Sequence, residues 1–252
     1  MQFEIYVLNL DKDEYRLKEI IKNLYPNKFN RISGVYGKKI DMNDFPEIFF
    51  TSKYLAPKSA IGSTLSHQKA TKEFLNNSNL DYAVILEDDA VPVNKNYMEE
   101  IRISIKNAPN DWDIIKLDYW PVYSSNYNTY PSVSLTAYII NKRSAKKILD
   151  YKVLYYYDIM LNFTSLKIYN NPNIVFKQIW DDNNKSNARN NNSYNPISLF
   201  YTGLDFKIIR IFNIEFTIAD VILLLILIIF FRVGYYYFPK NIKKNKKISK
   251  LK

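Results

Sequence analysis

The chain has 252 residues, and at about 100–200 residues per domain this length predicts one full domain and an appendage. Apolar residues make up 47%, enough to build a core and too many for a disordered chain. With no cysteine and one histidine, the sequence excludes zinc–thiolate sites, disulfide scaffolds, thiol nucleophiles and multi-histidine metal sites. The net charge is +10, and the last fourteen residues hold seven lysines and no acid.

The first half of the chain predicts alternating strands and helices. Met1–Leu10 lacks the basic start of a signal peptide, and residues 3–8 predict a buried strand instead. Apolar residues recur at helical spacing over Leu17–Leu24, which predicts a helix that Pro26 ends. The next predicted elements are a short strand at 31–35, an irregular stretch to 57, a helix at 62–76 and a strand at 82–86.

The alternation continues beyond this strand. The further predicted elements are a helix marked by Met98, Ile101 and Ile105, strands at 113–117 and 135–140, and a helix at 142–149. Strands and helices at this spacing are typical of an α/β domain whose sheet has a parallel core. Ligands of such sheets bind at the carboxyl ends of the strands. The acidic residues 87–89 and Asp118 both follow predicted strands there.

The composition changes after residue 180. Residues 181–196 hold seven asparagines in sixteen positions without apolar periodicity, so we interpret them as a linker that ends a domain at 1–196. In the remaining segment, 197–252, residues 221–231 are eleven uninterrupted apolar residues. As a helix that run is only about 16 Å long, but a helix over 218–238 would reach about 31 Å and span a bilayer.

A membrane-associated segment at 197–252 is the interpretation that we favour. A Lys-rich tail beside an apolar run indicates an anionic membrane surface rather than nucleic acid, and a buried core helix is the alternative. The positive-inside rule keeps the tail in the cytosol, whereas no signal peptide is present to export the domain. A helix lying in the cytoplasmic leaflet satisfies both constraints, with the folded domain on the cytoplasmic face. A single-pass span is the other geometry.

The sharpest local feature is the run Glu87-Asp88-Asp89 after an apolar strand. Three adjacent carboxylates repel one another unless a cation or solvent compensates. Mg²⁺ and Mn²⁺ prefer oxygen ligands and bridge one or two carboxylates to substrate phosphates. In an extended chain Glu87 and Asp89 point to the same side, so the pair is a candidate metal clamp. An acidic turn that merely leaves a strand is the alternative.

Several segments carry a family pattern in order. They are Ile5–Asp11 with Arg16, Arg31–Gly37, Ala60–His67, Val84–Asp89, Thr136–Lys147 and Tyr157-Asp158, with Pro172 and Gln178 closing the series. Together these segments resemble glycosyltransferase family 25, which includes lipopolysaccharide-type glycosyltransferases and procollagen galactosyltransferases. The resemblance covers about residues 3–190. Two departures are Ser63, where the family usually has cysteine, and Leu117–Trp120, where it usually has Leu-Gly.

The resemblance implies a GT-A fold, which is Rossmann-like, and a nucleotide-sugar donor such as UDP-galactose. It also implies a Mn²⁺ or Mg²⁺ cofactor and transfer with inversion to a glycan, glycolipid or protein acceptor. A metal on the diphosphate stabilises the charge that develops on the leaving group, and a carboxylate base deprotonates the acceptor hydroxyl.

The resemblance also assigns candidate roles to individual residues. Asp89 is the first metal ligand, and Glu87 contacts the metal or the donor ribose. The residues expected to line the nucleotide sugar are Asn9, Leu10, Arg16, Ser66, His67, Glu87 and Asp88. For Arg16 the alternative is a solvated arginine on a helix face, for His67 it is a buried histidine that holds a loop, and for Asp88 a structural role.

The catalytic base is expected to be Asp158 or Asp118, with Asp158 slightly favoured because three tyrosines that could stack on a sugar precede it. An ordinary aromatic core would place the same tyrosines there. A rival hypothesis of another class is a catalytically silent domain that acts as a membrane-tethered scaffold. The intact acidic run beside Ser66-His67 favours activity.

Overall fold

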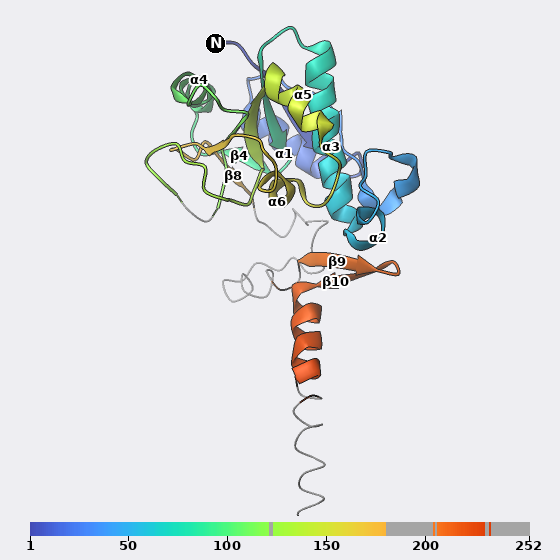
Figure 1. Ribbon diagram of the computed structural model, residues 1–252. Coiled ribbons are helices and arrows are strands. Elements are labelled where there is room, and N and C mark those ends of the chain that lie inside the picture. Colours follow the sequence, from blue (N-terminus) through green and yellow to red (C-terminus); the bar gives the residue numbers. More distant parts are fainter. Residues whose placement is uncertain (121–122, 180–203, 205, 230–231, 233–252) are drawn as a thin grey trace, which may run out of the picture.

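The computed structural model describes residues 1–120, 123–179, 204, 206–229 and 232 (Figure 1). Its strands are β1 (Glu4–Asn9), β2 (Asn30–Ser33), β3 (Tyr82–Glu87), β4 (Ala90–Pro92), β5 (Ile114–Lys116), β6 (Ala137–Asn141), β7 (Ile168–Asn170), β8 (Phe176–Gln178), β9 (Lys207–Ile211) and β10 (Ile214–Thr217). Its α-helices are α1 (Glu14–Leu24), α2 (Ser52–Leu55), α3 (Lys58–Asn77), α4 (Tyr97–Asn107), α5 (Lys142–Asp150) and α6 (Tyr157–Leu161). Two 3₁₀ turns, η1 (Gly37–Lys39) and η2 (Met42–Asp44), precede α2.

The centre of the fold is a six-stranded sheet in the order β2-β1-β3-β6-β5-β7. Parallel pairs join β1 to β2, β1 to β3 and β5 to β7. The α/β class and a parallel-rich sheet are therefore confirmed. The sheet is mixed, however, because β6 runs antiparallel to both β3 and β5. No described helix connects β5 to β6, and neighbouring strands joined without a crossover helix can run antiparallel.

Helices cover both faces of the sheet. Along β1, Ile5 and Val7 pack with the α1 and α4 side, whereas Tyr6 and Leu8 pack with the α3, α5 and α6 side. This alternation follows from the period of two in a strand. Strand β3 alternates in the same way and its four central residues are fully buried. Burial of each of the three larger side chains, Val84, Ile85 and Leu86, contributes about 1.5–3 kcal/mol. The near-continuous apolar strands seen in the sequence are thus strands buried on both faces.

Close backbone approach fixes the segment after β2 against α3. A Cβ at Gly37 would lie 1.8 Å from the carbonyl oxygen of Lys58, and one at Gly62 would lie 2.6 Å from the nitrogen of Gly37. The hydroxyl of Ser66 reinforces this contact, since it accepts from the amide of Val35 at 2.7 Å. Only glycine allows the loop and the helix to come this close.

We expect Gly37→Ala to destabilise the protein by about 1–3 kcal/mol or more, because the clashing atom belongs to the backbone and cannot rotate away. Urea unfolding measures this loss. Gly34→Ala is the matched control, since its Cβ would first meet the flexible side chain of Leu10 at 3.1 Å. Equal losses in the two variants would contradict the importance of the Gly37 contact.

The C-terminal segment is described in part. Residues 207–217, which the sequence analysis placed in the membrane-associated segment, form the antiparallel hairpin β9–β10 and contact α2. Residues 218–229 are helical, as predicted for the start of the 218–238 helix. Within the described residues no helix is long and apolar enough to cross a membrane. The proposed linker at 181–196 and the lysine tail lie outside the described residues.

Candidate active site

Asp88 is held between strand β1 and helix α1. Its Oδ2 accepts from Asn9 Nδ2 at 2.7 Å and its Oδ1 from Arg16 at 2.8 Å. Asn9, at the end of β1, in turn accepts from Arg31 Nε at 3.0 Å. Arg16 is only 12% exposed in its side chain, so it is an ion-pair partner rather than a solvated helix-face arginine. Asp88 is therefore directed into the fold, where its contacts fix the turn after β3 that also carries Asp89.

Asp89 is buried, as is Asp88. Its Oδ2 accepts from Gln178 Nε2 at 3.0 Å and lies 3.6 Å from Arg16. Its Oδ1 is buried and has no hydrogen-bond partner among the described residues. Burial raises the pKa of Asp89 to about 7, and the charge of Glu87 adds to this shift. A buried carboxylate oxygen without a partner is costly, so this atom is the natural place for a ligand.

Glu87 and His67 face each other at the end of β3. His67 Nε2 lies 3.3 Å from Glu87 Oε1, and its Nδ1 lies 3.0 Å from the hydroxyl of Tyr138. The imidazole also stacks on Tyr157, with ring centroids 4.6 Å apart. Burial lowers the pKa of His67 to about 3, so the ring is neutral at pH 7. Burial and the charge of Asp88 raise the pKa of Glu87 to about 8. The geometry matches the alternative of a buried, hydrogen-bonded histidine.

Asp118 and Asp158, the two candidate bases, are joined by Ser134. The hydroxyl of Ser134 donates to Asp118 Oδ2 at 2.7 Å, and its amide donates to Asp158 Oδ2 at 3.0 Å. Ser134 has a left-handed backbone, with φ of 70°. Burial raises the pKa of Asp118. The charges of Asp158 and Asp118 also raise the pKa of Glu87, so both acids lie within electrostatic reach of the first cluster.

A buried lysine lies near these acids. Lys116 is fully buried in β5 and donates to the carbonyl and hydroxyl oxygens of Ser132 at 2.7 and 3.0 Å. Burial lowers its pKa to about 8, although the charges of Asp158 and Asp118 oppose this shift. Sequence reasoning missed both Lys116 and Ser134. A lysine inside an apolar strand is a signal that could have identified the first, whereas nothing in the sequence marks the second.

A protein-family model described as "Glycosyltransferase family 25 (LPS biosynthesis protein)" matches residues 2–161, more than half of the chain. The chain belongs to glycosyltransferase family 25. The matched span runs through β1 to α6 and contains every candidate carboxylate discussed above. The prediction of the family and of a glycosyltransferase is therefore confirmed.

Solved structures add distant similarities. The chain is similar to protein A197 from STIV, with 11% identity and a TM-score of 0.43, over 72% of this chain and 87% of that one. It is also similar to a glycosyltransferase involved in glycosylation of the major capsid of PBCV-1, with 10% identity and a TM-score of 0.34. That match covers 59% of this chain and 63% of the other. No curated protein matches the sequence.

The acidic run of this family 25 member fits a divalent metal that has few protein ligands. Among the described residues, no group of three His, Cys, Asp or Glu side chains is placed to hold a metal ion by itself. Mg²⁺ sites that work on nucleotides use one or two carboxylates and complete their coordination with substrate phosphates and water. The unpartnered Oδ1 of Asp89 and the nearby Glu87 could supply such a pair.

Leu10 and Ser66 are the other two residues predicted to contact the nucleotide sugar. Leu10 is half-buried in the turn after β1, where its carbonyl accepts from the amide of Asp13 at 2.9 Å. Ser66 is buried, and its hydroxyl is engaged by backbone groups, donating to the carbonyl of Gly62 at 2.7 Å. The structure therefore brings the predicted residues to one end of the sheet but gives Ser66 a structural contact.

The raised pKa values predict a pH dependence with a definite sign. The carboxyls of Asp89 and Glu87 have ordinary values of 3.8 and 4.5 and values of about 7 and about 8 in the fold. Between these limits the two carboxyls hold more protons in the folded state than in the unfolded one, so they make stability without metal fall as the pH rises through this window. The lowered pKa of His67 has the opposite sign below its ordinary value of 6.5 and offsets part of this fall. Metal affinity should rise over the same window, because only ionised carboxylates bind.

Melting temperatures measured from about pH 5 to about pH 8, in EDTA and in Mn²⁺, check both trends. Glu87→Gln should flatten the decline in EDTA. A melting temperature in EDTA that rises steadily over this range would contradict the protonation states that we assign.

Proposed function

We propose that the protein is a metal-dependent glycosyltransferase that transfers a hexose, with UDP-galactose as the expected donor, to a glycan, glycolipid or protein acceptor. In this proposal the domain has a GT-A-like fold, and transfer inverts the anomeric carbon. The observation that carries the proposal is the buried, unpartnered Oδ1 of Asp89 at the carboxyl end of β3. In α/β sheets this end of the strands is where nucleotides bind.

The donor side is organised by the ends of β1 and β3. Asp89 and Glu87 would hold Mn²⁺ or Mg²⁺, which when bound stabilises the negative charge on the leaving diphosphate. Asn9 and Arg16 both donate to Asp88 and so fix the turn that follows β3. Arg16 also adds a positive charge beside Asp89. Leu10 in the neighbouring turn would contact the nucleotide. His67 would hold Glu87 in place by its hydrogen bond.

The acceptor side is formed by the acids that Ser134 joins. An inverting displacement needs a base on the face opposite the leaving group, and carboxylates usually serve. Asp158 is our first choice, because two backbone amides, of Ser134 and Ile159, hold its carboxylate at 3.0 and 2.9 Å. Asp118 accepts the hydroxyl of Ser134 instead and is the second choice. The buried ammonium of Lys116 opposes the rise that burial causes in the pKa of Asp118.

We place the protein at the cytoplasmic face of a membrane, held by the apolar residues that begin at 218 and by the lysine tail. Two observations support this location. Residues 222–229 form a described helical stretch whose apolar side chains are all exposed, between 43% and 62%. Seven lysines follow in the last fourteen residues of the sequence, and each contributes about 1 kcal/mol near an anionic surface.

A screen for nucleotide release tests the proposed activity. The purified protein is incubated with UDP-, GDP- and CMP-sugars in Mn²⁺ or EDTA, and the free nucleotide is measured. We expect UDP release from UDP-galactose that requires metal. If no nucleotide is released from any donor, the activity is refuted in favour of the silent scaffold. Release that is equal in EDTA would refute the metal dependence alone.

A further inference from the structure

The hairpin β9–β10 has its charged residues buried and its apolar residues exposed. Arg210 pairs in register with Glu215, and Arg210 is only 4% exposed. The neighbouring pair is Ile211 with Ile214, which are 41% and 61% exposed. Side chains alternate between the two faces of a strand, so these pairs lie on opposite faces. This arrangement is the inverse of an ordinary surface hairpin, whose outer face is polar.

The buried charges fix the orientation of the hairpin. Arg210 Nε donates to the carbonyl of Ala56 at 3.1 Å, and its guanidinium also donates to the carbonyl of Lys53. Glu215 accepts from the amide of Lys58 at 2.7 Å and pairs with Lys207 at 2.9 Å. The inner face is therefore bound to the domain, and the apolar face has to point away from it.

The tip of the hairpin adds a third observation. Phe212 and Asn213 form its two-residue turn, and both have a left-handed backbone, with φ of 49° and 68°. Glycine and asparagine adopt this conformation readily, whereas an aromatic residue adopts it at a cost. Phe212 is 94% exposed, so packing within the protein does not offset that cost. An aromatic side chain presented in this way indicates contact with something outside the domain.

The exposed apolar surface continues beyond the hairpin on both sides. The helical residues 218–229 start directly after β10, and Figure 1 shows them running away from the domain while the hairpin lies across its end. On the other side, α2 exposes Tyr54 (59%) and Leu55 (48%), and Phe50 just before it is 70% exposed. Apolar surface therefore covers one end of the described molecule.

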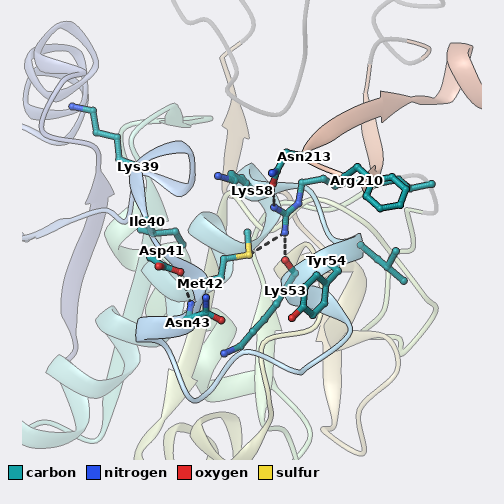
Figure 2. Close-up of a pocket in the computed structure, with 13 residues that line it drawn as sticks. Lys39, Ile40, Asp41, Met42, Asn43, Lys53, Tyr54, Lys58, Arg210 and Asn213 are labelled. Atoms are coloured by element: carbon teal, nitrogen blue, oxygen red, sulfur yellow. Dashed lines mark hydrogen bonds between the residues drawn. The ribbon is translucent and has the colours of Figure 1, made fainter.

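A basic cavity lies behind this surface. It has a volume of about 680 Å³, and its lining includes Lys39, Lys53, Lys58 and Arg210. Asp41 is the sole acidic residue lining it within the described chain. Figure 2 shows Arg210 reaching from the hairpin toward Met42 and Lys53 across this cavity. Lysines beside exposed apolar groups complement a bilayer that presents negative headgroups above an apolar interior.

We propose that the hairpin β9–β10, with α2 and the lysines of this cavity, docks the domain onto an anionic lipid bilayer. In this arrangement Phe212 and Ile214 enter the headgroup–acyl boundary, and Lys39 and Lys53 contact lipid phosphates. Resting on the function proposed above, the docking also identifies the acceptor as membrane-borne. Tyr155 and Tyr156 donate to hairpin carbonyls at 2.6 and 3.1 Å, and they lie three and two residues before the candidate base Asp158.

The absence of cysteine from the sequence makes a direct test available. A single cysteine is introduced into the full chain by Phe212→Cys and labelled with an environment-sensitive fluorophore. Tyr25→Cys is the matched control, since Tyr25 is 81% exposed and follows α1. Each labelled protein is mixed with phosphatidylglycerol–phosphatidylcholine vesicles or with pure phosphatidylcholine vesicles, and flotation measures total binding.

We expect the label at 212, and not the label at 25, to shift to the blue and to be quenched by spin-labelled lipid in the anionic vesicles. Adding Lys39→Gln and Lys53→Gln should raise the lipid concentration for half-maximal shift about tenfold. Lys22→Gln, on the exposed face of α1, should leave this lipid concentration unchanged.

Two outcomes would overturn the docking. One is protein that floats with vesicles while the label at 212 stays in water, which would leave the helix and tail as the anchor. The other is an equal response to pure phosphatidylcholine. Protein that does not float at all would refute the membrane location as well. Nucleotide release is measured on the same samples, and a loss there would instead concern the proposed activity.

Discussion

Asp89→Asn should lower sugar transfer at least about 100-fold, the order of loss expected when one electrostatic stabiliser of a leaving group is removed. The substitution keeps the shape of the side chain and its bond from Gln178, but it removes the charge that would hold the metal. Steady-state transfer from UDP-galactose, measured at saturating Mn²⁺, gives the fold-change. The metal concentration for half-maximal activity should rise in parallel.

The folding of this variant should suffer little. Burial and the charge of Glu87 already disfavour the ionised form of Asp89, so an uncharged amide relieves that repulsion. Thermal unfolding in EDTA checks this point, and Glu99→Gln, on the exposed side of α4, serves as a control for a lost carboxylate. Normal transfer with normal Mn²⁺ dependence in Asp89→Asn would refute the metal assignment.

Asp158→Asn should abolish transfer while leaving donor and metal binding intact. Positioned general bases contribute about 10²–10⁴-fold, and an amide cannot accept the proton of the acceptor hydroxyl. Because the amides of Ser134 and Ile159 hold the carboxylate of Asp158, its loss should leave the hydrogen bonds of the Asp89 cluster in place. The pKa of Glu87 should fall, since the charge of Asp158 helps to raise it, and a more readily ionised Glu87 does not weaken metal binding. Transfer is measured together with UDP binding by calorimetry, so that the two effects separate.

Asp118→Asn is the matched comparison, since Ser134 bonds both acids. We expect a smaller loss of transfer in this variant, because its carboxyl is engaged by the Ser134 hydroxyl. A larger loss of transfer in Asp118→Asn than in Asp158→Asn would make Asp118, and not Asp158, the catalytic base. Equal donor-binding defects in both variants would show that neither acid acts on the acceptor alone.

The elements that were predicted are those whose own sequence pattern shows which of their faces are buried. Strands β1 and β3 are apolar at almost every position because both faces are covered, and α1 shows its helical period. The acidic run was found for the same reason, since Glu87-Asp88-Asp89 stands out after an apolar strand. Its family context then placed Asn9 and Arg16 beside it, where the structure has them.

The parts that escaped prediction depend on contacts distant in the sequence. Strand β6 is apolar whether its neighbours run parallel or antiparallel to it, so its direction is not encoded in its pattern. Ser134 looks like any loop serine until the fold brings Asp118 and Asp158 to it. The hairpin β9–β10 lies in the segment 197–252, which the apolar run at 218–238 and the lysine tail led us to interpret as membrane-associated. The docking of Arg210 onto α2 is visible only in three dimensions.

Calorimetric titration of UDP into the protein, in Mn²⁺ and in EDTA, tests the central claim most directly. The site that we propose predicts binding in Mn²⁺ that weakens at least about tenfold in EDTA, because Asp89, with its unpartnered oxygen, would hold the metal that stabilises the charge of the diphosphate. Binding of equal strength in both buffers, or none in either, would contradict a metal-dependent nucleotide-sugar site at the end of β3.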